Sequence, residues 1–256
     1  MNRLIVPFLS VCFLLILVIK THSIFPMITG SGAPPYLIED LIPPPADRYA
    51  WLDDWVRPDG PPKVGLQVGH WKNEELPEEL SRLKGSTGST AGGKSEWEAS
   101  LVIAQNTKKI LEERNIQVDI LPATIPQKYW ADVFVSIHAD GSEDWSKSGF
   151  KIASPRRDYS GKAGKLVDLI EESYEKATGL EKDPNITRNM RGYYAFAWWR
   201  YNHAVHPKTA SAILETGFLT NYSDRQLLVN NPQLSAEGLA SGIINFLESE
   251  KLLSGG

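Results

Sequence analysis

The chain has 256 residues, a formal net charge of -4, and 42% hydrophobic and 23% charged residues. These values are typical of a folded globular domain with some additional segments, and the absence of a basic excess argues against nucleic acid as a partner. The single cysteine, Cys12, lies in an apolar N-terminal stretch, so any metal site of the globular part consists of histidines and carboxylates rather than thiolates.

Residues 1–20 are expected to direct the chain to a membrane. Arg3 supplies a positive start, and residues 4–19 are almost wholly apolar. This run is short for a spanning helix and fits a signal-peptide core at least as well. Two interpretations stay open: a cleaved signal peptide, for which residues 21–23 form a poor cleavage site, and an uncleaved membrane anchor, which we favour. Either one places the rest of the chain outside the cytoplasm, in the cell envelope.

Residues 21–62 are expected to form a proline-rich linker. Prolines cluster at positions 34–35, 43–45 and 61–62, and proline is excluded from helix interiors and central strands. Such a segment acts as a semi-rigid spacer. It also contains Tyr49, Trp51 and Trp55, which are too aromatic for a purely disordered segment, so part of it should pack on the following domain.

Residues 63–252 form the predicted catalytic domain, in which apolar runs alternate with amphipathic stretches. Strands are predicted at 64–68, 116–121, 131–140, 149–153 and 209–214, and helices at 95–114, 160–178 and 234–252. The polar segment 74–93 reads as a surface loop with room for one helical turn. This alternation predicts a single α/β domain with a mostly parallel, twisted sheet flanked by helices.

Three of the predicted strands end on a residue that binds metal ions or transfers protons: His70, His138 and Glu215. The strand before His138 is a continuous apolar run, as in strands buried on both faces of a sheet. Because ligands of open α/β sheets bind beyond the carboxyl ends of the strands, these side chains are placed for chemistry. The alternative for His138 is a histidine that only hydrogen-bonds a neighbouring loop.

A fourth candidate comes from the start of the first long helix, where two carboxylates need separate roles. Ser95 and Glu98 have the spacing of a capping box, in which the glutamate returns to the amide of the cap residue. Glu96 is then free to point away from the helix end. The alternative is that Glu96 only interacts favourably with the helix dipole.

His70, Glu96 and His138 together make a three-ligand site for Zn²⁺, which leaves a fourth position for water or substrate, as in catalytic sites. Glu215 is then the carboxylate beside the metal-bound water. Asp140 is a further possible ligand, but we favour a role in capping the turn that follows it. His203 and His206 read as loop or substrate-cleft residues, with no ligand role.

The chain resembles the zinc-dependent N-acetylmuramoyl-L-alanine amidases of the Amidase_3 type, from about Val64 to Leu247. The resemblance rests on four stretches: Gly69-His70; Glu96 with Leu101 and Ala104 at the family's spacing; residues 134–140, FVSIHAD; and residues 214–221, LETGFLTN, followed by Asp224. It implies that His70, Glu96 and His138 hold zinc and that Glu215 is the catalytic glutamate. Departures such as Trp71-Lys72 in place of Gly-Gly leave all four residues intact and concern substrate detail.

The resemblance implies hydrolysis of the amide between N-acetylmuramic acid and L-alanine of the peptide stem, with peptidoglycan, both glycan strand and stem, as the partner. Two alternatives stay open: a non-catalytic wall-binding or regulatory protein with the same fold, and a zinc peptidase that cuts within the stem. The presence of all four residues argues against the first. The aromatic residues 193–199 are expected to divide between the substrate cleft and the core.

Overall fold

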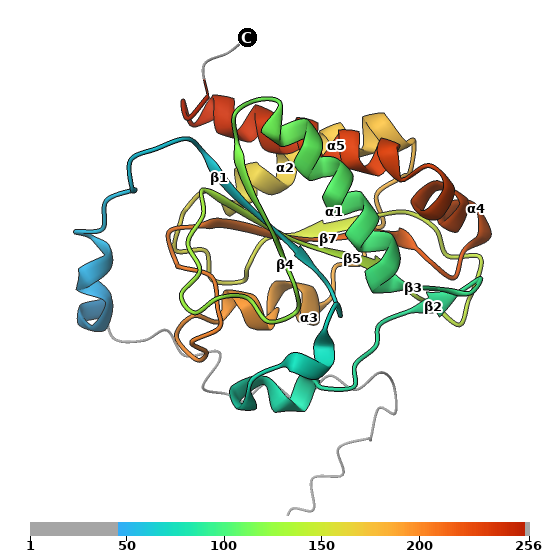
Figure 1. Cartoon of the computed structure of the whole chain (residues 1–256), viewed down its shortest axis with the longest axis horizontal. Coiled ribbons are helices and arrows are strands. Elements are labelled where there is room, and N and C mark those ends of the chain that lie inside the picture. The colour runs from blue at the N-terminus through green and yellow to red at the C-terminus, as the bar shows by residue number, and fades with distance from the viewer. Residues whose placement is uncertain (1–45, 254–256) are drawn as a thin grey trace, which may run out of the picture. The chain divides into compact units, whose positions relative to one another are not determined.

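The computed structural model describes residues 46–253 (Figure 1), all of which belong to one compact unit. The predicted signal or anchor segment, residues 1–20, and the first part of the predicted linker lie outside the described residues. Within residues 46–253, no helix combines the length and the apolar character that crossing a bilayer requires.

A five-stranded sheet forms the centre of the domain, in the order β4-β1-β5-β7-β6. Four strands are parallel and β6 runs antiparallel to β7, so the predicted mostly parallel sheet is confirmed. The strands are β1 (Lys63–Val68), β4 (Gln117–Leu121), β5 (Val133–Asp140), β6 (Lys151–Ala153) and β7 (Ala210–Phe218).

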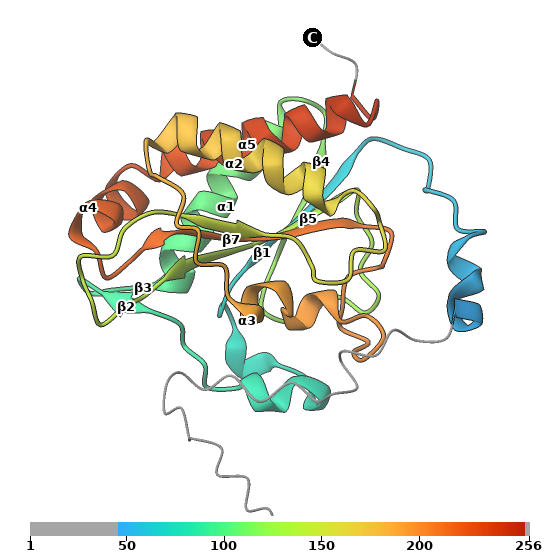
Figure 2. The same ribbon diagram turned by 180° about the vertical axis from the view of Figure 1, so that it is seen from behind.

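Helices cover one face of this sheet, and shorter elements cover the other (Figures 1 and 2). The first group comprises α1 (Glu96–Glu112), α2 (Ala163–Thr178) and α5 (Pro232–Ser249), and the second comprises α3 (Arg188–Arg191) and the 3-10 turn η5 (Tyr194–Phe196). The predicted helices are all present. Helix α2 begins three residues later than predicted, because Asp158 folds back and its Oδ2 accepts the Ala163 N–H at 2.9 Å.

The strands divide their side chains between two apolar cores. Val133, Val135 and Ile137 of β5 point to the helical face and pack with α1, α2 and α5, while Phe134 points to the other face and packs with Ile213 and the η5 segment. All of these side chains are buried. Side chains two residues apart on a strand point to the same face of the sheet. Because a shift by one residue would expose the buried apolar set, this alternation fixes the register of the sheet and the positions at which its strands end.

The long loop between β1 and α1 is more structured than the sequence predicts. It contains the 3-10 helices η3 (Asn73–Glu75) and η4 (Glu78–Leu83) and a small hairpin of β2 (Thr90–Ala91) and β3 (Lys94–Ser95). The hairpin leads directly into α1 (Figure 1). A second group of short elements, α4 (Tyr222–Arg225) and the π-helical turn η6 (Gln226–Asn230), follows β7.

The end of the predicted linker does pack on the domain. Residues Ala46–Leu52 form the 3-10 helix η2. The Tyr49 ring lies 4.6 Å from the Trp198 ring, and the Trp55 ring lies 5.9 Å from that of Trp130, between ring centroids. The aromatic residues of the linker therefore anchor its final part to the domain, as their composition predicts.

Candidate metal centre and active site

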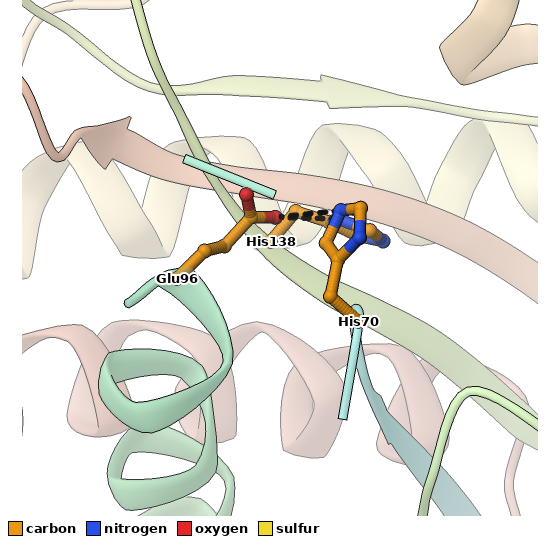
Figure 3. A group of neighbouring side chains, drawn as sticks. All are labelled: His70, Glu96 and His138. Carbon is orange, nitrogen blue, oxygen red and sulfur yellow. Dashed lines mark hydrogen bonds and ion pairs between the residues drawn. The ribbon is translucent and has the colours of Figure 1, made fainter. Parts of the chain in front are cut away.

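The fold brings His70, Glu96 and His138 together at the carboxyl edge of the sheet. His70 follows β1, Glu96 opens α1 and His138 lies on β5 (Figure 3). One potential ligand atom from each residue lies within 4.8 Å of the other two. The structure thus brings together the two strand-end histidines and the carboxylate from the helix start that the sequence singled out as one set.

Glu96 is at the centre of this cluster. Its side chain is buried, its Oε1 lies 2.7 Å from His138 Nδ1 and 3.4 Å from His70 Nε2, and its Oε2 accepts the Ser89 N–H at 2.8 Å. Burial favours the neutral acid, but the hydrogen bond from His138 and the charges of both histidines outweigh it and lower the pKa of Glu96. Glu96 is therefore a stable carboxylate, as a metal ligand has to be.

The Ser95 N–H donates to Glu98 Oε2 at 2.9 Å, and the expected capping box is present. The division of roles between the two carboxylates of the first turn is thus confirmed on the capping side. Glu98 stabilises the end of the helix, while Glu96 turns toward the histidines.

His70 is held in one tautomer by the loop that follows it. Its Nδ1 lies 2.7 Å from the Ser86 carbonyl oxygen. Because a carbonyl oxygen only accepts hydrogen bonds, Nδ1 carries the proton, and the lone pair of Nε2 is available to coordinate a metal ion. Burial, which outweighs the attraction of Glu96, lowers the pKa of His70. Its backbone adopts a left-handed conformation with φ of 60°, uncommon outside glycine and typical of functional sites.

His138 is buried and contacts groups on both ring nitrogens. Besides Glu96 at Nδ1, the Tyr193 hydroxyl lies 3.4 Å from Nε2 and donates to Gln67 Oε1 at 3.0 Å. Burial opposes protonation of His138, but the hydrogen bond and charge of Glu96 outweigh it and raise its pKa. The Thr216 hydroxyl donates to the His138 carbonyl at 2.8 Å, which ties β5 to β7 at the site.

Glu215 is the register partner of His138 on β7 and differs from Glu96 in its surroundings. Its Oε2 is buried and has no hydrogen-bond partner among the described residues. Burial raises the pKa of Glu215 to about 8; the charge of His138 opposes this, and Glu96 adds to it. A carboxyl group whose pKa lies near neutrality is suited to taking up and releasing a proton.

Asp140 caps the turn after β5, as we predicted in preference to a metal-ligand role. Its Oδ1 accepts the Gly141 N–H at 2.8 Å, and its Oδ2 pairs with the buried ammonium of Lys151. Lys151 also pairs with Asp183 at 3.3 Å. This ion cluster lies beside Glu215, because Lys151 is the register partner of Glu215 on β6.

His203 and His206 lie apart from the metal-ligand cluster. His203 Nδ1 lies 2.7 Å from Glu79 Oε1, and the His206 ring stacks at 5.1 Å from the Trp55 ring. Both are loop residues, and neither belongs to the cluster of potential metal ligands found within the described residues. Within the aromatic stretch, Tyr193 faces His138, with ring centroids 5.5 Å apart, and Phe196 is buried in the core.

Sequence reasoning missed the residues that hold the ligands in place. Ser86 and Ser89 come from the Gly/Ser-rich part of the long loop, and two glycines leave space for the ligands. A Cβ on Gly69 would overlap the His138 ring, and one on Gly88 would overlap Glu96 Oε2 and His70 Cδ2. The only sequence signal for this supporting loop is the presence of glycines close to the candidate ligands in the chain.

The donor set fits a zinc ion. Two imidazole nitrogens and one carboxylate oxygen converge, and three protein ligands are the number found in catalytic zinc sites. The fold and site thus define a class: an α/β protein with a His-Glu-His cluster that could hold a metal ion, beside a half-buried carboxyl group of raised pKa.

The chain belongs to the Amidase_3 family, described as N-acetylmuramoyl-L-alanine amidase, whose profile matches residues 64–245. No curated protein matches the sequence. The family membership establishes peptidoglycan amidase function, which implies action outside the cytoplasm, and gives no support to a non-catalytic protein.

Solved structures share the fold. The N-acetylmuramoyl-L-alanine amidase AmiC2 of Nostoc punctiforme is 17% identical with a TM-score of 0.55, over 75% of this chain and 99% of that one. The amidase Ami1 of Mycobacterium smegmatis is 17% identical with a TM-score of 0.54, over 73% and 97%. The catalytic domain of CwlV from Bacillus (Paenibacillus) polymyxa is 20% identical with a TM-score of 0.50, over 73% and 98%. At these identities the likeness concerns the fold alone.

Proposed function

We propose that this amidase is zinc-dependent, that His70, Glu96 and His138 hold the ion, and that Glu215 is the general base. The bond cleaved joins the lactyl carbonyl of N-acetylmuramic acid to the nitrogen of L-alanine. When bound, zinc polarises that carbonyl and lowers the pKa of a water molecule. The observation that carries the proposal is the convergence of three ligand atoms within 4.8 Å next to a carboxylate with an unpartnered oxygen.

Each side chain has a separate task in this proposal. His70 presents Nε2 because Ser86 fixes the proton on Nδ1. Glu96 supplies the negative charge of the ligand set. Glu215 takes a proton from the attacking water and passes it to the amine nitrogen as the bond to carbon breaks, so that L-alanine leaves with a free amino group. The raised pKa of Glu215 favours both the uptake and the release of this proton.

Digestion of purified peptidoglycan, followed by mass spectrometry of the products, tests the proposal. We expect intact glycan strands and free stems that begin with L-alanine, and we expect no products after treatment with a chelator until zinc is restored. Stems cut between amino acids would instead indicate a peptidase. Unchanged activity after complete metal removal would contradict the zinc-dependent mechanism.

We further propose that residues 1–20 anchor the chain to the membrane, with residues 21–62 as a spacer and residues 63–252 as the catalytic domain in the cell envelope. The apolar run after Arg3 and the poor cleavage site support the anchor. Cell fractionation should recover the intact chain with membranes. A soluble protein whose N-terminus lies near Ser23 would show cleavage instead.

A further inference from the structure

A glutamine lies buried in the central sheet, next to the candidate metal centre. Gln67 of β1 has no accessible surface. Its Nε2 donates to the Ala123 carbonyl oxygen at 3.1 Å and to the Tyr194 hydroxyl at 2.5 Å. Its Oε1 accepts a hydrogen bond from the Tyr193 hydroxyl at 3.0 Å. Buried amides are expected to be bonded in this way, but this one also reaches, through Tyr193, the candidate ligand His138.

The Ala123 carbonyl fixes the direction of these hydrogen bonds. A backbone carbonyl oxygen only accepts, so the NH₂ end of the Gln67 amide faces Ala123. The Tyr194 hydroxyl donates to the same carbonyl and is therefore free to accept from Gln67. An amide turned by 180° would place two carbonyl oxygens against each other. Gln67 Oε1 thus faces Tyr193 and requires a donor there.

The Tyr193 hydroxyl passes this direction on to His138. Its single proton goes to Gln67, and burial raises the pKa of Tyr193 well above its ordinary value, so the proton is retained. The hydroxyl oxygen lies 3.4 Å from His138 Nε2, at the long end of hydrogen-bond distances. An oxygen whose proton is already engaged only accepts from a ring nitrogen. The chain of bonds therefore places a proton on His138 Nε2.

The other nitrogen of His138 faces the ligand cluster. Its Nδ1 lies 2.7 Å from Glu96 Oε1, the same oxygen that lies 3.4 Å from His70 Nε2 (Figure 3). His70 has the reverse arrangement, because the Ser86 carbonyl holds its Nδ1 proton. The two histidines thus turn different nitrogens toward Glu96. A cation bound between them replaces the proton that Nδ1 shares with Glu96, whereas the Nε2 proton stays with Tyr193.

We propose that Gln67 and Tyr193 are positioning residues for His138, which hold a proton on its Nε2 so that Nδ1 coordinates the metal ion. This inference rests on the proposed role of His138 as a zinc ligand. The bonds through Gln67 and Tyr193 do for His138 what the Ser86 carbonyl does for His70. Partners that orient a ligating histidine and fix its tautomer typically contribute 10- to 100-fold to metal affinity.

Zinc affinity of the full chain, measured in competition with a chromophoric chelator, tests the role of the hydroxyl. Tyr193→Phe keeps the ring and should weaken zinc binding by roughly 10- to 100-fold. Tyr194→Phe is the matched control, because it removes a buried hydroxyl that bonds with the same Gln67 amide and with the Ala123 carbonyl. It should bind zinc as the parent does. Equal zinc affinity in Tyr193→Phe and the parent would overturn the inference, as would equal losses in the two variants.

A second variant tests the direction of the bonds rather than the presence of the hydroxyl. Gln67→Met removes the acceptor, so the Tyr193 proton is free to turn toward His138 Nε2 and favour the opposite tautomer. Zinc binding should weaken by about 3-fold or more, and the same change should add no further loss in Tyr193→Phe. Additive losses would contradict a shared chain of bonds. If Tyr193→Phe does not fold, an unchanged zinc affinity in Gln67→Met would overturn the inference.

Long-range ¹H–¹⁵N NMR spectra of the zinc-loaded protein, labelled at histidine, give a readout that a merely structural role would not change. His138 should carry its proton on Nε2 and zinc on Nδ1, and the Nε2 proton should exchange with water faster in Tyr193→Phe than in Tyr194→Phe. Zinc on Nε2 of His138 would overturn the inference. A parent that binds no zinc would overturn it together with the proposed function, whereas zinc bound equally by parent and Tyr193→Phe would overturn this inference alone.

Discussion

Two carboxylates, the buried Glu96 at the start of α1 and the half-buried Glu215 on β7, have opposite surroundings. Glu96 contacts both histidines and accepts a backbone N–H from Ser89, and its pKa is lowered. Glu215 has an oxygen with no hydrogen-bond partner among the described residues, and burial raises its pKa to about 8. Environments that separate the pKa values of two acids in this way assign them separate tasks.

The two carboxylates differ in their surroundings because one lies at the start of a helix and the other on a strand. Glu96 lies in the first turn of a helix, where the hydrogen bond from His138, the charges of both histidines and the Ser89 N–H of the preceding loop keep it charged. Glu215 lies on a strand whose own N–H and C=O groups are used in the sheet. The strand holds the Glu215 carboxyl firmly but provides no donor for Oε2, so this oxygen stays available for a proton.

The largest expected effect is that of removing a ligand. His138→Ala deletes one of three donors and leaves Glu96 without its closest partner, so the variant should contain no zinc and show the same activity as chelated protein. Metal analysis and hydrolysis of peptidoglycan on one preparation measure both. His203→Ala is the control, since His203 pairs with Glu79 away from the site, and it should keep both zinc and activity. Zinc retained in His138→Ala would remove that residue from the ligand set.

The second effect concerns the stability of the chelator-treated protein. Glu215 has a pKa of about 8 in the folded chain and an ordinary value of 4.5, so the folded state retains a proton that the unfolded state releases between these pH values. Stability should therefore fall as pH rises through this window, by on the order of 4 kcal/mol. Glu215→Gln removes this dependence, so its advantage in Tm over the parent should grow from pH 5 to pH 8. Parallel curves for the two proteins would contradict the raised pKa.

A smaller effect is expected from the loop that encloses Glu96. Gly88 has φ of +72°, and a Cβ there would overlap Glu96 Oε2 and His70 Cδ2. Gly85 has φ of +77° with no atom within 4 Å of such a Cβ. Both alanine variants carry the same backbone strain, but only Gly88→Ala should weaken zinc binding, by roughly 10- to 100-fold, as changes around metal ligands do. Equal zinc affinity in the two variants would show that the loop does not position the ligands.

The smallest effect is that of Glu98→Ala. Glu98 accepts the Ser95 N–H and belongs to the capping box, so its loss should cost about 1 kcal/mol of stability and leave zinc content unchanged. Chemical denaturation and metal analysis measure the two quantities. Loss of zinc from this variant would show that the two carboxylates of the first turn share the ligand role.

The sequence predicted the parts of the molecule that depend on local patterns. The apolar run of β5 is buried along almost its whole length, and His70, His138 and Glu215 lie toward the carboxyl edge that parallel strands share. Strand β7 is longer than predicted and continues to Phe218, so Glu215 lies within it. The two roles in the first turn of α1 followed from capping-box spacing. These features depend on chain periodicity, which a single sequence contains.

The remaining features depend on contacts between distant segments. Ser86 and Ser89 orient His70 and Glu96 from a loop with no hydrophobic periodicity, and Tyr193 contacts His138 across 55 positions of the chain. No local pattern determines such contacts.

The most direct test of the two roles compares Glu96→Gln with Glu215→Gln, by zinc content and amide hydrolysis on the same preparations. The amide is nearly isosteric with the carboxylate but cannot take a proton from water. Glu215→Gln should keep about one zinc per chain while turnover falls by about 10²- to 10⁴-fold, and substrate binding should change little. Glu96→Gln should lose both zinc and activity. Loss of zinc from Glu215→Gln, or its turnover near that of the parent, would contradict the assignment of Glu215 as the general base.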